Sequence, residues 1–137
     1  MTSVNDFLME NVDTKPETRE VKFKRFKSPF VIKSLTEDEN SVIQKDATRK
    51  IKDKQTRQVI SQLDQSKYID LMVLNSVVTP DLNSEQIQKS WNCLANPVGV
   101  LKKMLRAGEY IELMQQVQDL SGFDMEDVEE LKDEVKN

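Results

Sequence analysis

The chain is 137 residues long, carries 20 basic and 24 acidic side chains for a formal net charge of −4, and contains no histidine. The usual general base and the commonest metal ligand are therefore both missing, and the single cysteine, Cys93, can form neither an internal disulfide nor a zinc cluster. No phosphate-binding loop, dinucleotide fingerprint or nucleophile elbow occurs, so we predict no catalytic, cofactor-binding or metal-binding residue and no enzymatic activity.

The composition favours helices over sheets. Charged residues make up 32% of the chain and hydrophobic residues 37%, with only three glycines. A chain of this length suits one domain with one core. We predict a mainly α fold of the α+β class, in which about five helices surround a central buried helix and a small antiparallel β-hairpin lies near the N-terminus.

Residues 1–20 are predicted to form an N-terminal arm. Apolar residues recur at helical spacing from Val4 to Val12, which indicates a short amphipathic helix. Residues 13–20 are polar or charged apart from Pro16, a pattern typical of a solvated linker. The opening residues are acidic and lack a long apolar run, so we expect no signal peptide and a cytoplasmic protein.

Residues 21–34 are predicted to form the β-hairpin, because two β-prone runs flank a turn at Ser28 and Pro29. The segment 21–33 holds five basic residues and no acid, with phenylalanines between them. These phenylalanines could stack on bases in a small nucleic-acid-binding regulator, or they could face the core while the lysines face water. We favour the second interpretation and expect no specific nucleic acid, because the net charge of the chain is negative.

A helix is predicted from about residue 37, where Thr36 and Glu39 form a capping box. Its apolar stripe continues to Ile51, and its second half carries the basic residues Lys45, Arg49, Lys50 and Lys52. In residues 53–62 the apolar residues no longer recur at helical spacing, and apolar and polar residues do not clearly alternate as in a strand. A loop and a short strand both remain open for them.

The stretch from Tyr68 to Leu82 is predicted to be the centre of the fold. Apolar residues occupy every face of a helix that begins at about residue 65, so such a helix has almost no side to leave in water. Asp64 can cap its first turn, and Pro80 ends it. The run is too short to cross a bilayer, which needs about 20 apolar residues, so we expect no membrane contact.

Further helices are predicted from about residues 84, 97, 109 and 125. Asn83 forms a capping pair with Gln86, Asn96 precedes a proline suited to the first helical position, Gly108 ends that helix, and Gly122 fits the left-handed position after the next one.

Charge is uneven in the last part of the chain. Residues 109–137 hold ten acids and two lysines. The final helix carries three apolar residues on one face, Val128, Leu131 and Val135. It is either a solvated helix that keeps the protein soluble, which we favour, or a docking arm for a basic partner.

The order of several segments after residue 67 points to a family. A helix ending in VVTPDL is followed by SEQIQKSW, by KKMLRAGEY and by a helix ending in LSGFD. This order resembles the XkdN-like tail assembly chaperones of tailed phages and prophages. The resemblance covers about half of the chain in detail, and the hairpin and the Thr36 helix extend it, so we take residues 21–137 as one tail-assembly-chaperone-like domain.

The resemblance implies a function without catalysis. Such a protein binds the tape measure protein, with the tail tube protein as a second candidate partner, and keeps its client soluble while the tail tube assembles. It acts in the cytoplasm of the bacterial host and is not expected in the mature virion. The family supplies no catalytic or ligand-binding residue, and self-association is compatible with this role.

Four residues are candidates for partner binding because methionine and aromatic side chains dominate adaptable interfaces: Trp91, Met104, Tyr110 and Met114. The alternative for each is a place in the core, which we favour individually because stripes at helical spacing are normally buried.

Overall fold

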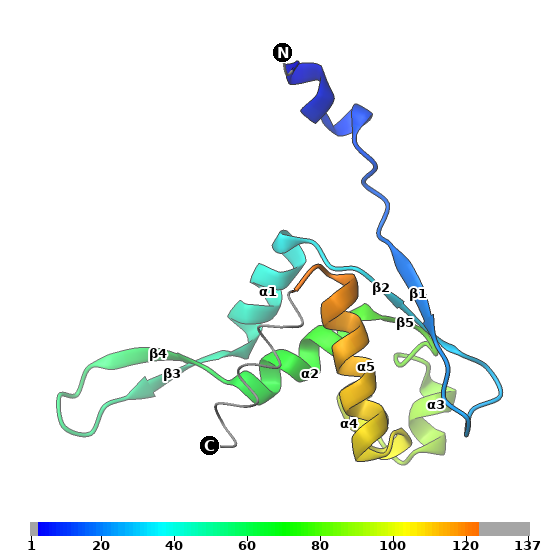
Figure 1. The fold of residues 1–137 in the computed structure, drawn as a ribbon. Helices are drawn as coiled ribbons and strands as arrows, with labels where there is room; N and C mark the ends of the chain where they lie inside the picture. The colour runs from blue at the N-terminus through cyan, green and yellow to red at the C-terminus, as the bar shows by residue number, and fades with distance from the viewer. Residues whose placement is uncertain (1–2, 124–137) are drawn as a thin grey trace, which may run out of the picture.

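The computed structural model describes residues 3–123 and has an α+β fold (Figure 1). Its helices are α1 (Glu37–Ala47), α2 (Gln65–Ser76), α3 (Glu85–Ser90), α4 (Pro97–Met104) and α5 (Ala107–Leu120). Its strands are β1 (Thr18–Val21), β2 (Phe30–Lys33), β3 (Thr48–Lys52), β4 (Val59–Leu63) and β5 (Val77–Thr79). The predicted class is confirmed, with five α-helices within 3–123, whereas the helix predicted from about 125 lies outside the described residues.

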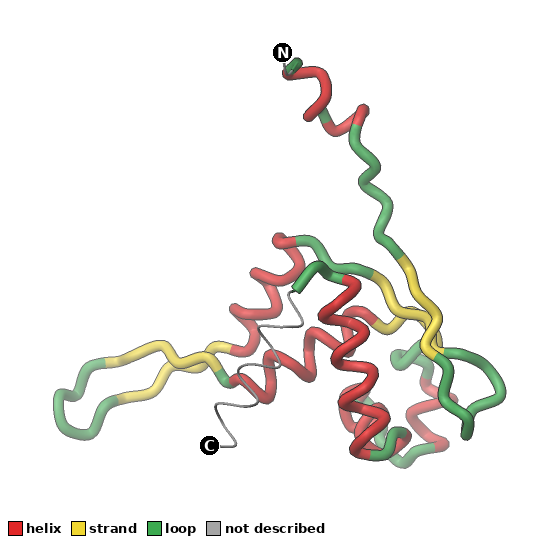
Figure 2. The backbone as a smooth tube through the Cα atoms, viewed as in Figure 1, coloured by secondary structure: helices red, strands yellow, loops and turns green. Residues whose placement is uncertain are grey.

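The strands form two small antiparallel sheets (Figure 2). One sheet has the order β1-β2-β5, and the other consists of β3 and β4 alone. The buried core lies between the three-stranded sheet and the helices α2, α4 and α5, with Ile32 from β2, Val73 from α2 and Leu113 from α5 each 0% exposed. The largest apolar residues of these elements therefore meet in one cluster, as expected for a single core.

Helix α2 contacts α1, α4, α5 and β5. The expectation that this helix leaves almost no side in water is nevertheless not confirmed, since only Met72, Val73 and Ser76 are buried and Asn75 is exposed. Its first turn, Gln65 to Lys67, is exposed as well, so the helix buries one side against the core and leaves the other in water.

The same helix ends earlier than predicted. It stops at Ser76, and Val77–Thr79 forms β5, which pairs antiparallel with β2. The reason is a run of three β-branched residues before Pro80, since such residues suit strands and a residue before proline disfavours α geometry.

The N-terminal strand pair also differs from the prediction. Its strands are β1 and β2, so most of the first strand lies within the predicted linker, and the residues between Val21 and Phe30 form a loop. The linker interpretation failed because the charged residue Arg19 packs against α5, where its guanidinium donates to Gln116 (2.7 Å) and Asp119 (2.9 Å).

Helix α1 is shorter than predicted, because it ends at Ala47 and the next five residues form β3. Thr48 Oγ1 donates to the carbonyl of Gln44 (2.7 Å) at this boundary. The undecided stretch 53–62 contains the turn and most of β4, which pairs with β3 over its whole length. Arg49, Lys50 and Lys52, which were predicted for the end of this helix, therefore lie on a β-hairpin, while Lys45 lies in the last turn of α1.

The predicted helix ends are confirmed at four places. Thr36 and Glu39 form the capping box, while Asp64 and Asn96 cap the starts of α2 and α4. Gly122 has φ 89° and follows α5. Two boundaries were wrong: Ser84 rather than its neighbour caps α3, and Gly108 lies in the first turn of α5 instead of ending α4.

The N-terminal arm extends from the body of the molecule in Figure 1. It contains two short 3₁₀ helices, Val4–Phe7 and Met9–Asn11, instead of one amphipathic α-helix. Its apolar side chains are open to solvent, with Phe7 73% and Met9 80% exposed. Isolated helices this short are marginal in water, so burial against the body would be needed to lengthen them.

Candidate functional site

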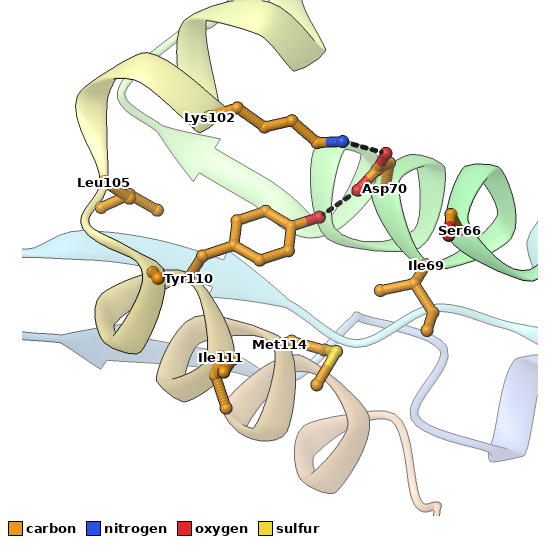
Figure 3. A pocket seen from close by; sticks show the side chains of 9 residues that line it. Ser66, Ile69, Asp70, Lys102, Leu105, Tyr110, Ile111 and Met114 are labelled. Atoms are coloured by element: carbon orange, nitrogen blue, oxygen red, sulfur yellow. Dashed lines mark hydrogen bonds and ion pairs between the residues drawn. The ribbon is translucent and has the colours of Figure 1, made fainter.

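A groove of about 550 Å³ runs between α2, α4 and α5 (Figure 3). Its lining is mainly apolar and comes from all three helices and from the α4–α5 connection: Ser66, Ile69, Asp70, Lys102, Leu105, Ala107, Tyr110, Ile111 and Met114. Apolar concave surfaces with a few polar groups at the edge are the common form of a binding site.

The α4–α5 connection shapes the groove. Helix α4 ends at Met104 and α5 begins at Ala107, so two extended residues, Leu105 and Arg106, join the two helices. Glu109 accepts a hydrogen bond from the backbone N–H of Arg106 (2.8 Å), which closes the start of α5. Ala107 and Gly108 then occupy the first turn of α5, and Ala107 lines the groove.

Three polar side chains connect the helices at the edge of the groove. Tyr110 Oη donates to Asp70 Oδ1 (2.6 Å), and Lys102 Nζ lies 2.7 Å from Asp70 Oδ2, as Figure 3 shows. Burial raises the pKa of the Tyr110 phenol well above its usual range, and the Asp70 carboxylate raises it further. One carboxylate therefore links α2 to both α4 and α5 and leaves a charged rim beside apolar residues.

A second polar cluster joins the α4–α5 connection to the loop between β1 and β2. The Arg25 guanidinium forms an ion pair with Glu109 and donates to the carbonyl of Met104 (2.9 Å). The hydrogen bond from Arg25, followed by that from the Arg106 backbone, lowers the pKa of Glu109, and the same ion pair raises the pKa of Arg25. This cluster holds the end of α4 against the loop between β1 and β2.

The structure brings two of the four candidate residues together. Tyr110 and Met114 both line the groove, and Met114 lies across from Ile69 in Figure 3. Met104 is in the core at 6% exposure, and Trp91 packs partly buried at the end of α3, where its carbonyl accepts from Lys103 Nζ (3.3 Å).

Ile111 also lines the groove and is 45% exposed. It was not among the residues predicted from the sequence, although it lies between the two candidates Tyr110 and Met114. The signal was available in the apolar stripe of α5, which is broader than one buried face requires. Ile69 and Lys102 had no comparable signal, because they come from other helices.

The phenylalanines of the segment 21–33 pack on one another. Phe23 and Phe30 are buried, and their rings meet edge to face at 5.4 Å, with Phe26 at 5.3 Å from Phe30. Base stacking requires an open aromatic face. The two buried rings are therefore not placed to stack on nucleic acid.

Within residues 3–123 no cluster of three or more histidine, cysteine, aspartate or glutamate side chains is arranged to hold a metal ion. None of the helices in that part of the chain has both the length and the apolar character that a membrane span needs.

Comparison with known proteins identifies the family. The model of the phage XkdN-like tail assembly chaperone protein family matches residues 4–136. The crystal structure of the protein YqbN is similar in fold, with a TM-score of 0.72 and 22% sequence identity over 90% of this chain and 99% of that chain. No curated protein matches the chain. Because the family match spans nearly all of the sequence, the chain belongs to the XkdN-like phage tail assembly chaperones, a family with a role in building the phage tail.

Proposed function

We propose that the chain is a non-enzymatic chaperone that binds the tape measure protein and keeps it soluble while tail tube subunits assemble. The observation that supports this function best is the apolar groove between α2, α4 and α5. An amphipathic helix commonly binds another protein by laying its apolar face in such a groove. Family membership indicates a role in tail assembly, and the groove offers a surface on which a client helix could bind.

The lining of the groove suits a client with an apolar helical face. Ile111 is 45% exposed, and Met114 and Tyr110 lie beside it on α5. Methionine adapts its shape to different partners, and an apolar patch left in water tends to associate with another one. A client helix that covers this patch would remove its own apolar face from water at the same time.

The charged rim would orient the client. Asp70 and Lys102 present opposite charges at one edge of the groove, at 15% and 53% side-chain exposure. Charged groups at the rim of an interface affect register and partner choice more than affinity. We propose that the rim selects the direction in which a client helix lies.

The remaining parts of the proposal concern where and with what else the protein acts. We propose that it works in the cytoplasm of the bacterial host, leaves the assembly before the virion is mature, and meets the tail tube protein as a second partner. These statements extend the family role in tail assembly to this chain.

The test is co-expression with the tape measure protein from the same genome. The fraction of soluble client would be measured with no chaperone, with the native chain, with Ile111→Glu and with Val42→Glu. Val42 is the matched control, since it is also an exposed aliphatic residue on a helix, at 59% exposure, but does not line the groove. Both variants must keep native thermal unfolding, because a folding defect would imitate lost binding.

We expect the native chain and Val42→Glu to keep the client soluble and Ile111→Glu to fail, since a carboxylate in the groove would face an apolar helix. An insoluble client beside the native chain would contradict the chaperone function. If a folded Ile111→Glu protein solubilises the client to the same extent as Val42→Glu does, the chaperone function would stand, but the groove would not be its binding site.

A further inference from the structure

Residues 3–17, the exposed part of the N-terminal arm, carry apolar side chains that no other described residue covers. Figure 1 shows the arm leaving the body of the molecule, and each residue from Ser3 to Glu17 is exposed. Before Glu17, the hydrogen bonds of the arm join its own residues to one another. A group of exposed apolar side chains is a common mark of an interaction site.

The arm would have one apolar face as a helix. Val4, Phe7, Leu8 and Val12 recur at the spacing of such a face, whereas Met9 would lie about 120° away from its centre. Residues 3–13 also contain no base and three acids, Asp6, Glu10 and Asp13. A surface that suits this arm must therefore be apolar and flanked by positive charge.

The groove between α2, α4 and α5 has both properties. Ile69, Ile111 and Met114 line it with apolar side chains (Figure 3), and such grooves accept amphipathic helices. Lys102 lies at one edge with its side chain 53% exposed, and Arg106, which is also exposed, lies in the α4–α5 connection that forms part of the lining. Opposite charges on the two surfaces favour their encounter and fix their orientation.

The arm begins on the far side of α5 from the groove. Arg19, just after the arm, donates to Gln116 and Asp119 of α5. Successive residues of an α-helix are about 100° apart, so both acceptors lie on the side of α5 opposite Met114. An arm that entered the groove of its own chain would have to pass around this helix.

The tether of the arm is too short for that path. Glu17 is fixed to Ser34, because its N–H donates to the Ser34 hydroxyl (2.9 Å) and its carbonyl accepts from the Ser34 N–H (2.8 Å). The next residue, Leu35, donates to Ser121 just after α5. From there the middle of the groove lies about 14 Å back along α5 and about 17 Å around it, roughly 22 Å in all. The chain from Val12 to Glu17 spans at most about 18 Å when fully extended.

We propose that the groove between α2, α4 and α5 binds the N-terminal arm of a second copy of this chain, and that two copies exchange arms. Phe7 and Leu8 enter the groove beside Ile111, and the arm extends into a longer helix as it is buried. Exchange makes the same contact twice, as a two-fold symmetric dimer requires. The contact itself needs no client; only its consequence, that arm and client compete for one groove, rests on the proposed function.

The test is sedimentation equilibrium of the full chain over a range of concentrations, without any client. The arm variant carries Phe7→Asp and Leu8→Asp, and the groove variant carries Ile111→Glu. Each has a matched control, because Met9→Asp changes an exposed arm residue off the apolar face and Val42→Glu changes an exposed helix residue outside the groove. All four variants must keep native thermal unfolding, since a folding defect would imitate lost association.

We expect the native chain and both controls to form dimers, and the dissociation constant to rise at least about tenfold in the arm variant and in the groove variant. An equimolar mixture of these two variants should recover dimers, because the intact arm of one chain then meets the intact groove of the other. The mixed dimer should dissociate more readily than the native dimer, since it makes one such contact instead of two.

A native chain that stays monomeric at about 1 mM would overturn the proposal, as would dimers that the arm variant retains or a mixture that recovers none. Arm amides that exchange slowly with solvent in the monomer, at every protein concentration, would assign the groove to the arm of the same chain and would equally overturn it. Because no client is present, a failed arm exchange and a failed chaperone function give different results.

Discussion

Replacement of Asp70 by alanine tests how the groove is held together. This carboxylate is 15% exposed, accepts from Tyr110 Oη at 2.6 Å and lies 2.7 Å from Lys102 Nζ. A hydrogen bond to a charged group contributes about 1.5–3 kcal/mol. The Lys102 ammonium is 53% exposed, so its pair adds only about 0.2–1 kcal/mol. We expect Asp70→Ala to lower the free energy of unfolding by about 2–3 kcal/mol.

The measurement is urea unfolding followed by the fluorescence of Trp91, the single tryptophan of the chain, and by far-UV circular dichroism. Two further variants, Tyr110→Phe and the double variant with Asp70→Ala, complete a double-mutant cycle. Because Tyr110→Phe keeps the ring, the cycle isolates the hydrogen bond, for which we expect a coupling of about 1.5 kcal/mol.

Lys102→Met is the control for the exposed half of the cluster. It keeps most of the side-chain length and removes the charge, so we expect a loss of only about 0.5 kcal/mol. A coupling between Asp70 and Tyr110 below about 0.5 kcal/mol would refute the reasoning, because the hydrogen bond would then contribute no more than an exposed contact.

Three other predictions follow from burial and charge. Val73 is 0% and Val78 is 47% exposed, so Val73→Ala should cost about 2 kcal/mol of unfolding free energy and Val78→Ala less than about 0.5; similar losses in urea unfolding would contradict the assigned burial. Ser76 is fully buried and its hydroxyl has no hydrogen-bond partner within residues 3–123, so Ser76→Ala should raise the thermal midpoint, whereas a clear drop would mean that the hydroxyl is bonded. The raised pKa of Tyr110 favours the neutral phenol in the folded state. Its contribution to stability is therefore fully present below the unfolded pKa of about 10 and is lost as pH rises above it. Unfolding measured against pH should show a smaller alkaline loss in Tyr110→Phe, and equal slopes would count against this assignment.

The candidate site could be predicted only in part. Tyr110 and Met114 stand out on α5 as an aromatic and a methionine, and both line the groove. Ile69, Asp70 and Lys102 do not stand out, because each looks like an ordinary residue on its own helix. They become parts of a site only when α2, α4 and α5 pack together, which single-helix periodicity does not describe.

The sequence by itself determined the features that depend on neighbouring residues. Thr36, Asp64 and Asn96 cap helices because a side chain reaches a backbone N–H two or three residues away, and Gly122 occupies a left-handed position that other residues avoid. The tertiary structure decided that two segments predicted as linker and as helix became strands. Thr18–Val21 and Thr48–Lys52 each pair with a partner strand that satisfies their backbone groups. Strand hydrogen bonds join residues distant in the chain, so a partner can override the local preference, whereas a helix closes its bonds within four residues.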